Sequence, residues 1–416
     1  MSEAAEPLTP TAPTAARLDL LAPLRVRNFR NLWIGQNVSL AGDQFKFVAL
    51  SWLVLSLTGR SGALGTVLML QAIPRAILML LGGVVTDRLR PRTVMLGSDL
   101  LRAGVVGLFA YFTATGRITM PGVYALALLF GIVHAFFFPA ASSIMPELVE
   151  PGLLRQANAL NQVTSQVVLF GAPALAGWLV ATVGTAGGFA VDASSFLISA
   201  IFLMLIGTAP RPAGTARQSP WRDLAEGFGV LRRDRLLAAV IAMASIFFFG
   251  YAGATYVGIP VLAKALDAGP RGLGLLFSAY GLGALAGGLF GGTVHVRRRG
   301  PVSTTAIALM GLVFAAIALA QGVWQAAALL VGSGAVFAWL GIIYITLIQQ
   351  RAPRAFVGRV MGMLMFGIYG LYPVSYGLAG WISEWLGVRA LFVAGGAMIT
   401  LAGIAGWTVP ELRRLD

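Results

Sequence analysis

Ionisable residues stand inside long apolar stretches of this chain, where a charge is costly and usually has a function. Asp43 and Lys46 are three positions apart, so a helix would place both on one face. An acid in this setting can be a proton site that alternates between its charged and neutral forms, or it can belong to a static ion pair. The candidates for proton coupling are Asp43, Lys46, Arg75, Asp99, Arg102 and Asp192.

Both interpretations stay open for Asp43, which we expect near mid-depth with Lys46 or Arg75 as its partner. Structural pairing is favoured for Asp99 with Arg102, one turn apart, and a structural role is favoured for Asp192. A histidine titrates near neutral pH, but His134 is favoured as a packing residue.

The composition indicates what kind of elements must hold these residues. Of the 416 residues, 57% are hydrophobic and only 11% are charged, with a mean hydropathy of +0.81. Soluble domains are about 25% charged, and a membrane-spanning helix needs about 20 apolar residues. We therefore predict an all-α integral membrane protein with twelve transmembrane helices. Their expected ranges are 30–57, 63–86, 93–115, 120–144, 156–182, 187–208, 236–263, 272–295, 302–321, 324–348, 358–383 and 389–409.

The basic residues predict the orientation of the helices. With the N-terminus in the cytoplasm, 22 of the 30 Lys and Arg residues fall in cytoplasmic segments and 5 in outer loops. Positive charge collects on the cytoplasmic side, so we expect both termini there. Only Lys46 and Lys264 are lysines, which with the many Ala and Gly residues points to a high-GC bacterium and its inner membrane. The role of these basic residues in membrane topology thus accounts for the net charge of +14, and we expect no nucleic-acid partner.

A polar central segment divides the chain into two groups of six helices. Leu175–Trp178 recurs as Leu378–Trp381, 203 residues later, and the Gly82–Val85 stretch has a counterpart at 291–294, 209 residues later. Six plus six helices in a parallel repeat is a transporter architecture. The expected parts are an N-terminal tail (1–27) that is not a signal peptide, a first bundle (28–208), a cytoplasmic loop (209–235), a second bundle (236–410) and a C-terminal tail (411–416).

The loop between the second and third expected helices has the most specific motif. It resembles the major facilitator superfamily, whose signature here is G-x-x-x-D-R-x-G-R-[RK]. The matching positions are Gly83, Asp87, Arg88 and Arg92, whereas Arg90 and Pro91 depart from the pattern. The resemblance implies a gating latch, in which Asp87 sits at the positive N-terminus of the helix that begins near Gly358. Adjacent arginines would pair with acids such as Asp99.

The fifth expected helix contains a second partial motif. Gly171, Pro173 and Gly177 resemble the antiporter motif G-P-x-x-x-G-G of drug-exporting facilitators, and such residues bend a helix and allow close packing. An ordinary Gly/Pro kink is the alternative. Together with the stretches 39–44, 145–149, 156–160, 191–196 and 357–361, the chain resembles the macrolide-efflux and enterobactin-exporter branch of drug:proton antiporters from about Arg27 to Pro410.

Polar and aromatic residues are candidates for lining a substrate cavity. Such a lining suits large, mostly apolar compounds, and aromatic faces can hold a cation. Packing between helices is the alternative for each of them. They are Gln36, Asn37, His134, Gln162 and Gln166 in the first half, and Tyr251, Tyr256, Tyr280, Trp339 and Tyr369 in the second.

These expectations lead to a secondary active transporter, a proton-coupled exporter of drugs or amphipathic small molecules that works by alternating access. The alternatives are a dedicated exporter of one secreted metabolite, such as a siderophore, and a transport-inactive membrane receptor or scaffold. We expect no enzyme, cofactor or metal site, because the chain has no Cys, no ligand cluster and no G-x-x-x-x-G-K-[ST] loop. The expected partners are a small-molecule substrate, protons and the lipid bilayer, with the protein as a monomer.

Overall fold

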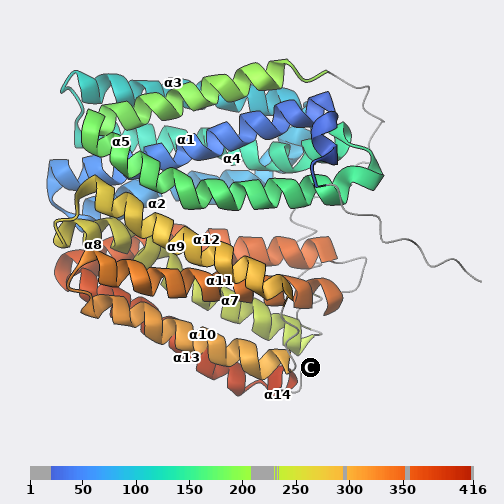
Figure 1. Ribbon diagram of the computed structural model, residues 1–416, viewed down its shortest axis with the longest axis vertical. Helices are drawn as coiled ribbons and strands as arrows, with labels where there is room; N and C mark the ends of the chain where they lie inside the picture. Colours follow the sequence, from blue (N-terminus) through green and yellow to red (C-terminus); the bar gives the residue numbers. More distant parts are fainter. Residues whose placement is uncertain are drawn as a thin grey trace, which may run out of the picture.

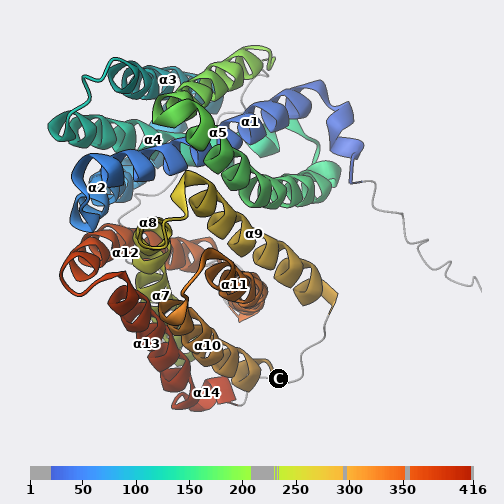
Figure 2. The ribbon, with the colours of Figure 1, turned by 60° about the vertical axis from the view of Figure 1, so that its left-hand side comes forward.

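The structure, a computed structural model, places two bodies of helices side by side (Figure 1). It describes residues 20–207, 229, 232, 234–293, 298–351 and 357–413. The elements from α1 to α5 form one body and those from α7 to α14 form the other, as the second view also shows (Figure 2). An all-helical fold was predicted from the apolar runs, and the described residues confirm it.

The elements of the first body are η1 (Ala22–Arg25), α1 (Arg27–Thr58), α2 (Ser61–Arg88), α3 (Pro91–Ala114), α4 (Met120–Leu148), η2 (Pro151–Leu153) and α5 (Leu154–Met204). Those of the second are α7 (Arg235–Gly253), η3 (Ala254–Gly258), α8 (Ile259–Ala265), α9 (Gly269–Thr293), α10 (Arg299–Ala316), η4 (Ile317–Leu319), α11 (Val323–Arg351), α12 (Val357–Trp385), α13 (Val388–Trp407) and α14 (Pro410–Arg413). Most bounds lie within a few residues of the predicted ones.

One helix differs from the prediction, and one pair of predicted helices is joined at a sharp break. The predicted helices 156–182 and 187–208 are the two arms of α5, which are separated by a non-helical break at Gly184, whose φ of 83° is open to glycine but costly for other residues. The two arms of α5 meet at this break (Figure 1). The predicted helix 236–263 is divided by a π-helical turn, η3. Ten helices of the described chain are long and apolar enough to cross a membrane, so the number of twelve crossings stays a prediction.

The two bodies meet along two pairs of helices, α2 with α12 and α5 with α9. We call the end where α5 finishes and α7 begins the linker end, and the other the opposite end. Both contacts are centred toward the opposite end, at glycines. A Cβ added to Gly65 would lie 2.8 Å from the Cα of Gly380, and one added to Gly177 would lie 3.0 Å from the Cα of Gly274. These helices therefore touch backbone to backbone, which only small residues permit.

Polar contacts reinforce the same end. Glu384 at the end of α12 accepts hydrogen bonds from Arg60 Nε (2.7 Å) and from the backbone N–H of Gly62 (2.8 Å). Lys264 Nζ donates to the backbone carbonyl of Leu55 at 2.5 Å. Each of these bonds joins the first body to the second, so the opposite end is closed.

The α5–α9 contact can be tested with a cysteine pair in this cysteine-free chain. Ser278 Oγ lies 3.0 Å from the backbone nitrogen of Ala174, so the two helices are close enough here for a short bifunctional thiol reagent to cross-link cysteines at Ala174 and Ser278. We expect Gly177→Val to lower the yield at least severalfold, because its side chain would collide with the backbone of α9. Gly171→Val on the same helix meets open space and should leave the yield unchanged. Equal yields in both variants would contradict the contact.

Candidate functional site: a buried charge cluster beside a cavity

A cluster of charged side chains lies inside the first body, where α1, α3 and α5 pack together. Two of its parts are pairs within one helix, Asp43 with Lys46 and Asp99 with Arg102. The third part, Asp192, joins them because α5 packs on α1. A Cβ on Gly42 would lie 2.6 Å from Asp192 Oδ1, so Asp192 faces the turn of α1 that bears Asp43. Residues far apart in sequence thereby form one polar site within an apolar body.

Lys46 and Asp43 form the first pair of the cluster. Lys46 Nζ lies 2.5 Å from Asp43 Oδ1, and the lysine side chain is only 8% exposed. The same nitrogen lies 3.5 Å from the centroid of the Phe130 ring and 5.9 Å from that of Phe196. An ammonium over an aromatic face is stabilised by the ring quadrupole, so Lys46 is held from two sides.

Arg102 and Asp99 form the second pair, and both are almost completely buried. The guanidinium carbon of Arg102 lies 4.0 Å from the Phe137 ring centroid and 4.3 Å from that of Phe196. Its Nη1 is 3.4 Å from His134 Nδ1. His134 therefore belongs to the charge cluster as a neighbour of Arg102.

Asp99 pairs with Arg102 on its own helix, the structural pairing favoured from the sequence, whereas its pairing with the arginines of the preceding loop stays a prediction because the side chain of Arg88 lies outside the described part of the chain. One of those arginines, Arg92, has a different role. Its Nε donates to the carbonyl of Leu203 at 2.7 Å and its Nη2 to that of Met204 at 2.8 Å. A cation at the C-terminus of α5 matches the negative end of the helix dipole.

Several polar atoms of the cluster have no hydrogen-bond partner among the described residues. They are Asp99 Oδ2, Asp192 Oδ2, Arg75 Nε and Arg102 Nε. Asp192 is fully buried, and among the described residues its Oδ1 accepts a side-chain hydrogen bond from Ser195 Oγ at 3.4 Å. Unpaired buried polar atoms are costly, which marks this cluster as functional or strained. Arg75 makes no ion pair with a described residue and instead lies 5.1 Å from the Tyr369 ring of α12 in the second body.

A cavity of about 520 Å³ opens beside the cluster, between α1, α3, α4 and α5. We call it the first-half cavity. Its polar lining is Gln36, Asn37, Ser39, Asp43, Arg102, His134, Ser142, Asn158, Asn161 and Ser165. Asp43 thus borders open space and is 24% exposed, whereas Asp99 and Asp192 are fully buried. The cavity lies in the linker half of the body, away from the closed opposite end.

The structure separates the cavity candidates into two groups. Gln36, Asn37 and His134 line the first-half cavity, and Gln162 and Gln166 do not. Three residues on the same helix, Asn158, Asn161 and Ser165, line it instead, and they were not among the predicted cavity residues. Their spacing of three and four places them on one helix face, which was the available signal.

The aromatic candidates of the second half form a packed core. Tyr251 stacks on Phe337 at 5.0 Å and lies 6.0 Å from Tyr280. Tyr256 reaches the first body, where its ring is 5.7 Å from that of Phe47 on α1. Trp339 packs against Gly291, and Tyr369 faces Arg75. None of these five lines the first-half cavity.

The two sequence motifs lie at different places. Pro173 and Gly177 belong to the contact between the bodies, while Gly171 faces open space. Gly83, Asp87 and Arg88 lie in the last turns of α2, and Gly358 in the first turn of α12. Their side-chain contacts fall outside the part of the chain that the structure describes, so the latch stays a prediction.

A bundle of long apolar helices in two bodies, with charges and a cavity inside, defines a multi-pass membrane transporter. The family described as "Transmembrane secretion effector" matches residues 19–416, nearly the whole chain. The chain therefore belongs to this family, an efflux branch of the major facilitator superfamily, which confirms the resemblance to that superfamily and to macrolide-efflux proteins.

Relatives agree with this assignment, and solved structures share the fold. The chain is 26% identical over 387 residues to "Multidrug efflux pump Tap" of Mycolicibacterium fortuitum, covering 90% of this chain and 94% of that protein. It is 22% identical over 393 residues to "Macrolide efflux protein A" of Streptococcus pyogenes, covering 93% and 97%. A bacterial homologue of the iron transporter ferroportin in an inward-facing state shares the fold, with a TM-score of 0.73, 15% identity, and coverage of 92% and 98%. A D-xylose-proton symporter shares it with a TM-score of 0.69, 15% identity, and coverage of 95% and 99%.

The buried pair of Asp99 and Arg102 predicts a stability effect. Removing one partner of a buried ion pair leaves an uncompensated charge and costs about 3–5 kcal/mol. Asp99→Asn should therefore lower the thermal unfolding temperature of the purified protein in detergent. Adding Arg102→Met should recover part of the loss, and the exposed control Glu411→Gln should have no effect. An unchanged temperature for Asp99→Asn alone would show that the pair is not needed for folding.

Proposed function

We propose that the chain is a proton-coupled exporter of drugs or other amphipathic small molecules that works by alternating access in a bacterial inner membrane. The observation that carries this proposal is the position of Asp43. Asp43 is an acid paired with Lys46, and Asp43 itself borders a cavity large enough for part of a substrate. The efflux functions named for its relatives support the direction of transport.

The geometry supports a simple cycle. With the linker end in the cytoplasm, the described conformation is open toward the cytoplasm on the side of the first-half cavity and closed at the opposite end. A substrate entering the cavity would meet Asp43 in its charged form. Protonation from the outer side would release Lys46 from its partner and favour release of substrate. The two bodies would rotate along the α2–α12 and α5–α9 interfaces, and opening of the opposite end would separate the glycine contacts there.

An accumulation screen tests the function. Cells with and without the gene would be exposed to macrolides, cationic dyes, tetraphenylphosphonium and siderophores. Lower accumulation of several unrelated compounds is the expected result. Lower accumulation of one metabolite would favour the dedicated exporter, and no difference for any compound would favour the receptor or scaffold.

Asp43 can be tested in reconstituted vesicles with an imposed pH gradient. If it carries the coupling proton, Asp43→Asn should bind substrate but lose uphill transport, while downhill exchange continues. The static-pair alternative predicts a loss of folding, because Lys46 would be left buried without its partner. In that case Lys46→Met should restore expression of the Asp43→Asn protein. Full uphill transport by a stable Asp43→Asn protein would refute the coupling role.

The proposed orientation can be tested at Gln218, in the predicted cytoplasmic segment 209–235. A cysteine placed there should react with a membrane-impermeant maleimide in inside-out vesicles and not in intact cells. The absence of native cysteines provides the background control. Labelling from outside intact cells would contradict the proposed orientation.

A further inference from the structure

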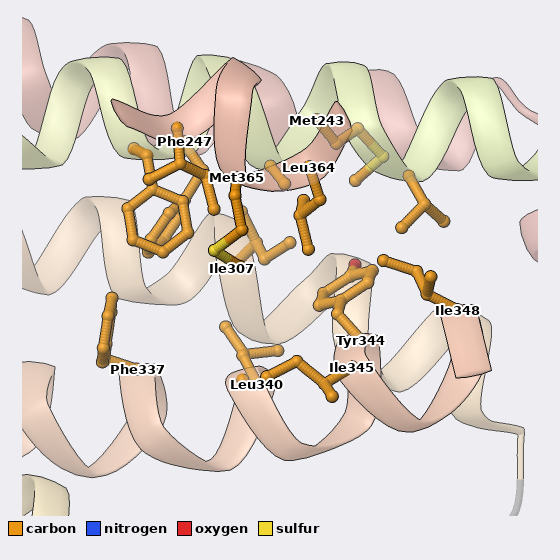
Figure 3. A pocket seen from close by; sticks show the side chains of 15 residues that line it. Met243, Phe247, Ile307, Phe337, Leu340, Tyr344, Ile345, Ile348, Leu364 and Met365 are labelled. Carbon is orange, nitrogen blue, oxygen red and sulfur yellow. The ribbon is translucent and has the colours of Figure 1, made fainter. Parts of the chain in front are cut away.

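The second body has a pocket of its own, which we call the second-half pocket. It has a volume of about 130 Å³ and lies between α7, α10, α11 and α12. Figure 3 shows side chains from these helices pointing toward one another across it. The residues that define its walls include Met243, Phe247, Phe337, Leu340, Tyr344 and Met365.

The lining of this pocket is apolar. None of the described residues that border it is charged, and the hydroxyl of Tyr344 is already engaged with Ser303 Oγ at 3.3 Å. An engineered apolar cavity of about 150 Å³ stays free of water and binds benzene. A pocket of this size and chemistry thus fits one aromatic ring or one branched alkyl group. Met243 and Met365 add flexible walls that adapt to different shapes.

The second-half pocket is the repeat counterpart of the first-half cavity. The repeated stretches set an offset of 203–209 residues between the halves. Within that range, polar lining positions of the first half correspond to lining positions of the second. The corresponding residues are Asp43 and Phe248, Arg102 and Ile307, His134 and Gly341, Asn158 and Met365, and Asn161 and Ile368.

At these corresponding positions the first-half cavity is lined by polar residues and the second-half pocket by apolar ones. We propose that the second-half pocket is a binding site for the apolar ring or branched alkyl group of an amphipathic substrate. This inference rests on the proposed export of amphipathic compounds and names how such compounds are recognised. Any ring of suitable size can enter an apolar pocket, which accounts for a broad substrate range.

Gly341 offers a way to fill the pocket without disturbing its walls. It lies on the face of α11 that also bears Phe337, Tyr344 and Ile348, so its added side chain would point into the pocket. A Cβ there would meet no atom within 4 Å. Gly341→Leu should thus occupy the space, and it replaces glycine with a better helix former. Gly332→Leu is the matched control on the same helix, because its Cβ meets only Val313 at 3.9 Å and it does not line the pocket.

The experiment measures binding of two cations to the purified full-length protein. Tetraphenylphosphonium has rings and tetraethylammonium has none. We expect Gly341→Leu to weaken tetraphenylphosphonium binding about tenfold or more, since a buried ring loses its apolar contacts. The control Gly332→Leu should match the unaltered protein, and the weaker binding of tetraethylammonium should be the same in all three.

The outcomes separate this inference from the proposed function. Equal affinity of Gly341→Leu and Gly332→Leu for tetraphenylphosphonium would overturn the pocket assignment. If the unaltered protein binds this cation but vesicles do not transport it, the proposed export of such cations is refuted. The comparison of Gly341→Leu with Gly332→Leu still tests whether the pocket binds the ring. Absence of binding to the unaltered protein would contradict both.

Discussion

Close backbone contact at four glycines is the constraint on which the arrangement of the two bodies depends. In a bilayer, apolar side chains gain little by leaving lipid for protein, so helices associate through close packing and hydrogen bonds. Gly65 with Gly380, and Gly177 with Gly274, bring two helix pairs together near one end. Away from these pairs the bodies can separate, so the linker end can open while these contacts hold, and opening of the other end requires the contacts to part.

The distribution of charge follows from the cost of burial. Charged side chains in an apolar interior need partners, and they are gathered in the first body around α1, α3 and α5. Lys46 and Arg102 each combine an acid on their own helix with aromatic faces from neighbouring helices. The equivalent region of the second body is apolar. The two bodies share a fold while the first provides the polar chemistry and the second an apolar surface.

The sequence could predict what depends on local spacing. The repeat of Leu175–Trp178 at 378–381 anticipated that Gly177 and Gly380 hold equivalent places, and both lie at contacts between the bodies. The three-residue spacing within each ion pair was also sufficient to predict that its two members share one helix face. Contacts that depend on how one helix is rotated against another could not be predicted. Arg75 facing Tyr369 is one example, because neither residue's neighbours along the chain indicate the other.

The most direct test of alternating access is a pair of distances measured by spin labelling in vesicles. Labels at Arg117 and Trp324 report on the opposite end, and labels at Arg155 and Arg298 report on the linker end; all four residues are exposed. Switching from neutral pH with tetraphenylphosphonium to acidic pH without it should lengthen the first distance and shorten the second. Two distances that stay constant, or that change in the same direction, would contradict the account.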